Sequence, residues 1–177
     1  MARGILRRLS ALPACLALFS CAALADATPN CTGAAPEAIA PLAQAAAESP
    51  LNRQLQKTYG SATSCRVRAT EGKRTLEIAY PHGGRFEMDT DGRLEYVRQS
   101  ARFAGGKTSP DAKTGLANLR EYERSAAAPD GCGVDWRPMR RAAGTGKWEA
   151  EGTSCNCKAT MELKGGKVRL LAFGLAC

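Results

Sequence analysis

Cysteine is the residue type that most constrains what this chain can fold into. The chain of 177 residues has eight cysteines, and two of them, Cys15 and Cys21, lie in an apolar N-terminal segment. The other cysteines are Cys31, Cys65, Cys132, Cys155, Cys157 and Cys177. An even number of cysteines in an exported chain is typical of a disulfide framework. The sequence therefore predicts a body held together by three disulfides.

The N-terminus has the layout of a secretory signal peptide. Arg3, Arg7 and Arg8 form a positive region, an uncharged apolar stretch from about residue 9 to 24 follows, and Ala23-Leu24-Ala25 has the form that signal peptidase accepts. We expect cleavage after Ala25 and a periplasmic or secreted mature protein. No later stretch is apolar enough to span a bilayer.

A second interpretation of the N-terminus concerns lipid attachment. Leu18-Phe19-Ser20-Cys21 resembles a bacterial lipobox, in which Cys21 would carry the lipid, although Phe19 fits that pattern poorly. An envelope lipoprotein is therefore kept as an alternative. A free amino group on Asp26 of the mature chain would exclude it.

A hairpin pattern near the C-terminus narrows the pairing of the cysteines. A three-residue loop at Gly165-Gly166-Lys167 would place Met161 opposite Leu171 and Ala159 opposite Phe173. A buried sheet face needs such a register, and a two-residue loop would shift it by one residue. The same register places Cys155 opposite Cys177. The predicted disulfides are Cys155–Cys177, Cys132–Cys157 and Cys31–Cys65.

Cys155 and Cys157 are one residue apart and invite other interpretations. A thioredoxin-type redox pair has two residues between its cysteines at a helix start. A metal site needs more ligands nearby, and the only histidine, His82, is distant in sequence. Two cysteines at this spacing on a strand face the same way and can bond to different partners. We therefore predict structural disulfides, no metal site and no cofactor.

The first part of the mature chain has a helical pattern followed by strand patterns. Residues 36–59 are predicted to be helical, with a bend or restart at Pro41 and a second start at Ser49-Pro50, where Ser49 would be the N-cap. Alternating strands follow between residues 65 and 96. A three-residue loop at the Asp91-Gly92 turn would pair Met88 with Leu94 and Phe86 with Tyr96.

The second part repeats this order in outline. Ser109-Pro110-Asp111 is predicted to open a helix with the stripe Leu116, Leu119 and Tyr122, and short strands follow at about 133–136, 147–151, 155–163 and 168–175. The expected fold is α+β, with two helices packed on antiparallel β-meander sheets. One interpretation is a tandem helix-plus-meander repeat, in which residues 1–25 are the signal, 26–104 the first half and 105–177 the second. One continuous α+β domain is the alternative.

Charge favours anionic partners. The net charge of the chain is +8, and the predicted signal contributes three arginines and no acid. A basic surface favours anionic partners such as lipopolysaccharide, anionic lipid or acidic glycan, and the expected partner is an anionic envelope component or a protein. Because the charge forms no long block of one sign, nucleic acid is not the expected partner, and simple solubility is an alternative explanation.

One short region combines both tryptophans with several cations. Tryptophan and arginine often anchor interfaces, and arginine can also clasp phosphate or carboxylate. The predicted binding residues are Trp136, Arg137, Arg140, Arg141, Lys147 and Trp148. The alternative is that the tryptophans belong to the core and the cations form a solvated rim.

Catalytic motifs are sparse. No nucleophile elbow, Walker loop or dinucleotide fingerprint occurs, and residues 87–98 lack the closing acid of a calcium loop, because Arg98 stands in its place. His82 could act with Glu87 or Glu95 in a ribonuclease-like pair, but it lies in a predicted turn. We therefore expect an exported, non-enzymatic binding module. The alternative is a small secreted hydrolase that uses carboxylates or His82.

Overall fold

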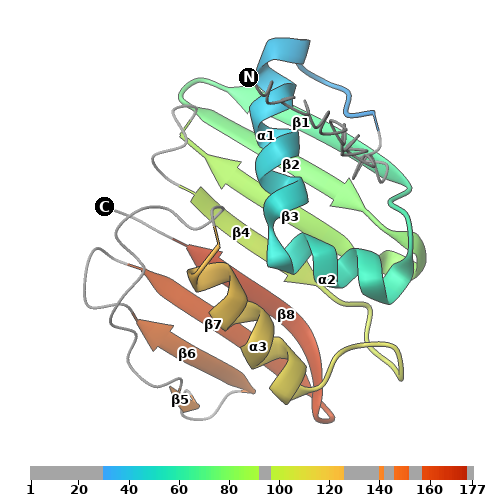
Figure 1. The fold of residues 1–177 in the computed structure, drawn as a ribbon, viewed down its shortest axis with the longest axis vertical. Helices are drawn as coiled ribbons and strands as arrows, with labels where there is room; N and C mark the ends of the chain where they lie inside the picture. Colours follow the sequence, from blue (N-terminus) through green and yellow to red (C-terminus); the bar gives the residue numbers. More distant parts are fainter. Residues whose placement is uncertain (1–29, 92–96, 126–139, 142–145, 152–156, 175–177) are drawn as a thin grey trace, which may run out of the picture.

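The computed structural model describes residues 30–91, 97–125, 140–141, 146–151 and 157–174. Within these residues the chain forms one eight-stranded antiparallel sheet, with three α-helices on one of its faces (Figure 1). The helices are α1 (Pro36–Glu48), α2 (Pro50–Tyr59) and α3 (Ala112–Glu123), with a short 3-10 turn, η1 (Pro81–Gly83). The strands are β1 (Ser64–Thr70), β2 (Lys73–Ala79), β3 (Arg85–Thr90), β4 (Val97–Arg102), β5 (Arg140–Arg141), β6 (Lys147–Glu151), β7 (Lys158–Lys164) and β8 (Lys167–Gly174). The predicted α+β class is confirmed.

Two meanders meet at the middle of the sheet. The strand order is β1-β2-β3-β4-β8-β7-β6-β5, so the strands of each half follow one another in space. β4 pairs with β8 antiparallel, with Arg98 opposite Gly174 and Arg102 opposite Leu170. Each half therefore supplies helix and then meander, yet a single sheet runs through both halves. The tandem repeat with a boundary after residue 104 stays a prediction.

The prediction of two helices is wrong in number, because the segment 36–59 forms two separate helices. Ser49 lies between them with an extended backbone (φ −70°, ψ 122°), and Pro50 begins α2. Pro41 lies inside α1 without ending it. Gly60 ends α2 with a positive φ of 83°, as the sequence predicts.

The two predicted helix starts also differ from expectation. Ser49 occupies the N-cap position of α2 but its side chain makes no cap hydrogen bond. At α3 the cap is Asp111, whose carboxylate accepts a 2.8 Å hydrogen bond from the backbone N–H of Thr114. That bond holds the pKa of Asp111 below its ordinary value. The hydroxyl of Ser109 instead accepts a hydrogen bond of 3.0 Å from the backbone N–H of Gly105.

The core lies between the helices and the covered face of the sheet. α2 packs on β3 and β4, and α3 packs on β7 and β8. The ring centroids of Tyr122 and Phe173 are 4.2 Å apart. Large fully buried side chains in this layer are Tyr122, Phe86, Phe173, Leu42, Leu51, Leu55, Leu76, Ile78, Met88, Met161, Leu171 and Gln99. Most of these positions follow the predicted apolar alternation, and burial of each aliphatic or aromatic side chain stabilises the fold by about 1.5–3 kcal/mol.

The predicted register of the last hairpin is confirmed, but a different turn produces it. Met161 lies opposite Leu171 and Ala159 opposite Phe173. The turn itself has two residues, Gly165 (φ 59°) and Gly166 (φ 73°), as a tight primed hairpin turn requires. A β-bulge between Glu162 and Leu163 restores the register by leaving one extra residue in β8.

The predicted register between β3 and β4 is wrong. Met88 lies opposite Gln99, and Phe86 lies opposite Ala101. β4 begins only at Val97, so the connection is longer than the predicted loop, and Leu94 and Tyr96 lie outside the described residues. This register puts Ala101 and the neighbouring Phe103 under the helices, at the cost of burying the polar side chain of Gln99.

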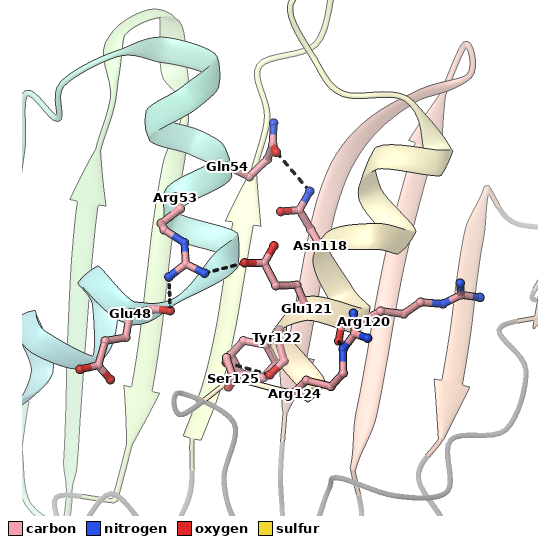
Figure 2. Close-up of polar contacts among 9 residues, drawn as sticks. All are labelled: Glu48, Arg53, Gln54, Asn118, Arg120, Glu121, Tyr122, Arg124 and Ser125. Carbon is pink, nitrogen blue, oxygen red and sulfur yellow. Dashed lines mark hydrogen bonds and ion pairs between the residues drawn. The ribbon is translucent and has the colours of Figure 1, made fainter.

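Polar contacts join the helices of the two halves (Figure 2). The guanidinium of Arg53 on α2 forms a 2.6 Å ion pair with Glu121 on α3, and it also donates to the backbone carbonyl of Glu48 at 2.8 Å. The side-chain amide of Asn118 donates to Gln54 at 3.1 Å. Since the ion pair is solvent-exposed, it fixes the orientation of the helices more than it adds stability.

The predicted disulfide Cys31–Cys65 is confirmed. The segment beside it is attached to β1, because Thr32 donates to the carbonyl of Cys65 (3.1 Å) and accepts from the N–H of Val67 (2.7 Å). Cys157 is also disulfide-bonded. The predicted pairs Cys155–Cys177 and Cys132–Cys157, the signal peptide and Cys21 involve residues outside those described, and they stay predictions.

Candidate functional site

The sheet face opposite the helices carries polar and charged side chains, and we call it the open face. Strand alternation sends the apolar side chains toward the helices and the intervening polar ones to this face. Among the described residues its cations outnumber its acids. The cations are Arg66, Arg68, Lys73, Arg85, Arg98, Arg102, Arg140, Lys147 and Lys158, and the acids are Glu77, Glu87, Asp89, Glu149, Glu151 and Glu162.

Toward both edges of the open face, charges form cross-strand pairs. On one side Arg68 pairs with Glu77, and Lys73 pairs with Asp89 at 3.3 Å. On the other side Lys147 pairs with Glu162 at 3.2 Å, and Lys158 pairs with Glu149 at 3.4 Å. Opposite charges on neighbouring strands attract, so these flanking regions are largely neutralised.

Three arginines, Arg85, Arg98 and Arg102, lie at the centre of the open face, and we call them the arginine group. Arg85 and Arg102 are direct cross-strand partners on β3 and β4. Within the described part of the chain, none of the three forms an ion pair or a side-chain hydrogen bond. Like charges directly opposite each other destabilise a sheet. The centre of the face therefore has a positive potential that an anionic group would neutralise.

A small hollow of about 80 Å³ adjoins this arginine group. Its floor includes Ser100 of β4 and Ala172 of β8, which are cross-strand partners at the junction of the two meanders. Its lining residues are Glu87, Asp89, Arg98, Ser100, Arg102, Leu170 and Ala172. The hollow exists because short side chains stand between longer ones, and it can accept one protruding side chain.

Asp89 lies in the wall of this hollow, where its carboxylate is bonded to other residues of the sheet. Its carboxylate accepts a 2.7 Å hydrogen bond from the hydroxyl of Thr75 and forms the ion pair with Lys73. Only 8% of the residue is exposed. Because both partners belong to β2, the carboxylate is already satisfied within the sheet, and it is a poor candidate for acid–base chemistry.

The described residues of the predicted tryptophan–arginine patch lie on both sides of the sheet. Arg140 lies opposite Glu149, and Arg141 lies opposite Trp148. Strand alternation therefore puts Arg140 and Lys147 on the open face, whereas Trp148 is half-buried against the core on the other side. Trp136 and Arg137 lie outside the described residues. Binding at this patch stays a prediction.

His82 lies in the exposed turn η1 with a positive φ of 58°. No side-chain hydrogen bond joins it to another residue in the part of the chain that the structure describes. Glu87 lines the hollow on β3, and Glu95 is outside the described residues. The described residues include no group of three His, Cys, Asp or Glu side chains that could hold a metal ion. Strands β3 and β4, rather than helices, flank the segment considered as a calcium loop.

The arginine group was not among the binding residues predicted from the sequence. Arg85, Glu87 and Asp89 alternate with apolar residues, as do Arg98, Ser100 and Arg102 with buried ones. This alternation could have placed them on one face. The predicted register of β3 with β4, however, put residues 94 and 96 opposite β3, so the two rows were never brought together.

No protein-family model matches this chain, and neither a curated protein nor a solved structure matches it. In the described ranges, none of the helices has both the length and the apolar character needed to cross a membrane.

Proposed function

We propose that the protein is an exported, disulfide-bonded binding module whose open face docks an acidic surface of a partner protein. The arginine group at the centre of that face carries the proposal. Arg98 and Arg102 line a hollow, and Arg85 lies opposite Arg102. None of the three forms an ion pair with a described residue, while Asp89, the acid opposite Arg98, is paired with Lys73.

The shape of the face also supports a protein partner. A helix-free sheet offers a wide surface, which suits another folded surface better than a small molecule. The hollow of about 80 Å³ is far smaller than a typical small-molecule pocket of about 300–1,000 Å³. Arginine is enriched at the energetic centres of such interfaces. An acidic or aromatic side chain of the partner would enter the hollow, and acids around it would meet the arginines.

Support for the alternative, a small hydrolase, is weaker. His82 is at an exposed turn, and Asp89 is satisfied by Thr75 and Lys73. Export and cleavage after Ala25 remain parts of the proposal that rest on the sequence. Lipidation of Cys21 is the alternative to that cleavage.

Site-specific photocrosslinking tests the proposal. A photoreactive amino acid at Ser100, in the floor of the hollow, should capture a discrete partner from envelope extract, and mass spectrometry would identify it. The same group at Lys57, exposed on α2, is the control and should not capture that protein.

The identified partner is then purified and titrated calorimetrically. Replacing Arg85, Arg98 and Arg102 with Gln should weaken binding by at least about tenfold, which corresponds to about 1.4 kcal/mol. The double variant R140Q/R141Q removes two cations at the edge strand and should change affinity much less. Equal losses in both variants would assign binding to the predicted tryptophan–arginine patch and overturn the docking surface proposed here.

A further inference from the structure

A larger hollow is lined by the segment that leads from β4 to α3 and by the turn between β7 and β8. Figure 1 shows these two segments at the same end of the sheet. Its volume is about 440 Å³. The lining residues are Gly105, Gly106, Lys107, Lys164, Gly165, Lys167 and Arg169. We call it the glycine–lysine hollow. The two chain segments that form it are joined, because the N–H of Val168 donates to the carbonyl of Pro110 at 2.8 Å.

Four cations gather around this hollow, and Asp111 is a neighbouring acid that interacts electrostatically with Lys167. Lys107, Lys164, Lys167 and Arg169 form no ion pair with any residue that the structure describes. Asp111 lies next to Lys167, but its carboxylate caps α3 through the N–H of Thr114. Like charges around a concave surface concentrate positive potential and attract anions.

Glycines keep the hollow free of side chains. Gly105, Gly106 and Gly165 all have positive φ values, of 94°, 82° and 59°, which favour glycine. At Gly106 and Gly165 a β-carbon would meet nothing within 4 Å, so the backbone there borders open space. At Gly105 a β-carbon would lie 1.7 Å from a guanidinium nitrogen of Arg169. A side chain at this position would displace the guanidinium of Arg169 from its place beside the loop.

The β-bulge fixes the position of Arg169. Arg169 is the extra residue of β8, and its carbonyl accepts a 2.9 Å hydrogen bond from the N–H of Phe103. Its guanidinium donates to the carbonyl of Ala104. Bulges often redirect a side chain beside a functional site. Here the bulge and the loop together hold the cation at the wall of the hollow before any ligand arrives.

We propose that the glycine–lysine hollow binds a multiply charged phosphate-type oxyanion. The three lysines supply mobile positive charges, and the planar guanidinium of Arg169 supplies an oriented one. The volume of about 440 Å³ accommodates a diphosphate or a phosphorylated headgroup. This site is separate from the arginine group on the open face.

Calorimetric titration of the oxidised protein with inorganic pyrophosphate at low salt tests the proposal. The variant K107Q/K164Q changes two exposed lysines and should weaken binding by at least about tenfold. In NMR spectra, pyrophosphate should shift the amide signals of Gly105, Gly106 and Gly165 saturably. Saturable shifts confined to another region of the protein would overturn the proposal.

Two control variants separate this site from general electrostatic attraction. K57Q/R124Q removes two exposed positive charges from α2 and the end of α3, and R85Q/R98Q/R102Q removes the arginine group of the open face. Both should keep pyrophosphate affinity within about threefold of the wild type at equal salt. A loss in K57Q/R124Q equal to that in K107Q/K164Q would overturn the proposal.

Vesicles distinguish the source of the phosphate. If the ligand is a lipid headgroup, vesicles with phosphatidic acid, whose phosphomonoester can carry two negative charges, should bind the wild type, K107Q/K164Q should abolish that binding, and phosphatidylcholine vesicles should not bind. If pyrophosphate binds but neither vesicle does, the site takes a soluble phosphate. Absence of both pyrophosphate and vesicle binding would overturn the proposal.

Discussion

The phenol of Tyr80 donates a 2.6 Å hydrogen bond to the side-chain carbonyl of Asn52, and both side chains are buried. The amide of Asn52 in turn donates to the carbonyl of Ala46 at 3.0 Å. One chain of hydrogen bonds thus connects the residue that follows β2 with α2 and with the last turn of α1. The break between α1 and α2 leaves carbonyls to be satisfied, and Asn52 satisfies one of them.

Removing this network should destabilise the protein measurably. We expect Tyr80→Phe to lower the free energy of unfolding by about 1–2 kcal/mol, because it leaves the buried carbonyl oxygen of Asn52 without its donor. Asn52→Ala should cost more, since it leaves the buried hydroxyl of Tyr80 without its acceptor. It also removes one of two donors to the carbonyl of Ala46, the other being the backbone N–H of Ser49. Urea unfolding followed by circular dichroism measures both. The hydroxyl of the half-buried Tyr59 accepts a 2.8 Å hydrogen bond from the N–H of Ala104 at an exposed position, where water can replace it, so Tyr59→Phe should cost less. Tyr59→Phe is the control, and an equal loss there would contradict the prediction.

Alkaline pH should lower the free energy of unfolding by ionising the same tyrosine, Tyr80. Burial raises the pKa of Tyr80 from 10.0 to about 12, although its hydrogen bond to Asn52 opposes the shift. Burial also raises the pKa of Tyr122. The folded state favours the neutral phenol. The contribution of this preference to the free energy of unfolding is complete below pH 10 and is lost as the pH rises from about 10 through about 12. For Tyr80 it amounts to about 2–3 kcal/mol.

Unfolding curves of the wild type and Tyr80→Phe across this pH range isolate that contribution. Lysines also lose their charge there, but they do so equally in both proteins. The stability of the wild type should therefore fall more steeply than that of the variant. Parallel curves, or a tyrosinate signal for Tyr80 that appears near pH 10, would refute the assignment.

The disulfide Cys31–Cys65 closes a loop with a sequence separation of 34 residues. Loss of its restraint on the unfolded chain should cost about 4 kcal/mol in the double variant C31S/C65S. Chemical unfolding under oxidising conditions measures the loss. The bridge also holds the segment around Thr32 against β1, so hydrogen exchange at Val67 should rise.

The thiol content tests the wider disulfide framework. If all six cysteines of the predicted mature chain are bridged, the oxidised protein unfolded without reductant has no titratable thiol. Two or more thiols would contradict the three-disulfide prediction. Cys31, Cys65 and Cys157 are disulfide-bonded, so free thiols would have to come from the remaining cysteines.

Gly115 should resist replacement although it lies inside a helix. A β-carbon there would lie 2.8 Å from the sulfur of Met161 and 2.9 Å from a methyl carbon of Val168. Alanine would gain about 1 kcal/mol of helix propensity, but overpacking of α3 against the sheet costs about 1–3 kcal/mol. We therefore expect Gly115→Ala to be destabilising in thermal unfolding. Val168→Ala should partly rescue Gly115→Ala, and additive losses would speak against the steric explanation.

Local chemistry predicted several elements of this fold. Gly60 ends α2 because glycine tolerates the required positive φ, and alternation fixed which residues of β7 and β8 face the core. The turn at Gly165 and Gly166 could not be inferred alone, because a bulge further along β8 compensates for its length. The turn is one residue shorter than predicted, and the bulge adds one unpredicted residue to β8. These two differences cancel, so the pairing of Met161 with Leu171 is predicted correctly although the turn is not.

The arginine group of the open face was not predicted from the sequence, for a different reason. Its arginine group depends on the pairing of β3 with β4, and that pairing depends on the length of the loop between them. The sequence favoured Leu94 and Tyr96 as partners because they are apolar. The structure instead uses Gln99 and Ala101, since the chain must also bring β4 beside β8 and Phe103 under the helices. These are long-range requirements, which local patterns do not contain.

The pairing of β3 with β4 buries the side chain of Gln99, and this burial lowers the stability of the folded protein. Its side chain is fully buried, its amide donates only to the sulfur of Met88 at 3.5 Å, and its carbonyl oxygen has no hydrogen-bond partner in the described structure. A buried polar atom without a partner costs about 1–3 kcal/mol. Methionine has nearly the same shape and no such atom. We therefore expect Gln99→Met to raise the free energy of unfolding by about 1 kcal/mol.

Urea unfolding at neutral pH measures this gain. Gln56→Met on α2, at a partly exposed position, is the matched control and should change stability by less than about 0.5 kcal/mol. Gln99→Ala should be destabilising by about 2 kcal/mol or more, since it leaves a cavity. If Gln99→Met lowers the free energy of unfolding by as much as Gln99→Ala, the buried amide of Gln99 stabilises the fold. That result would contradict the prediction that burying this amide is destabilising.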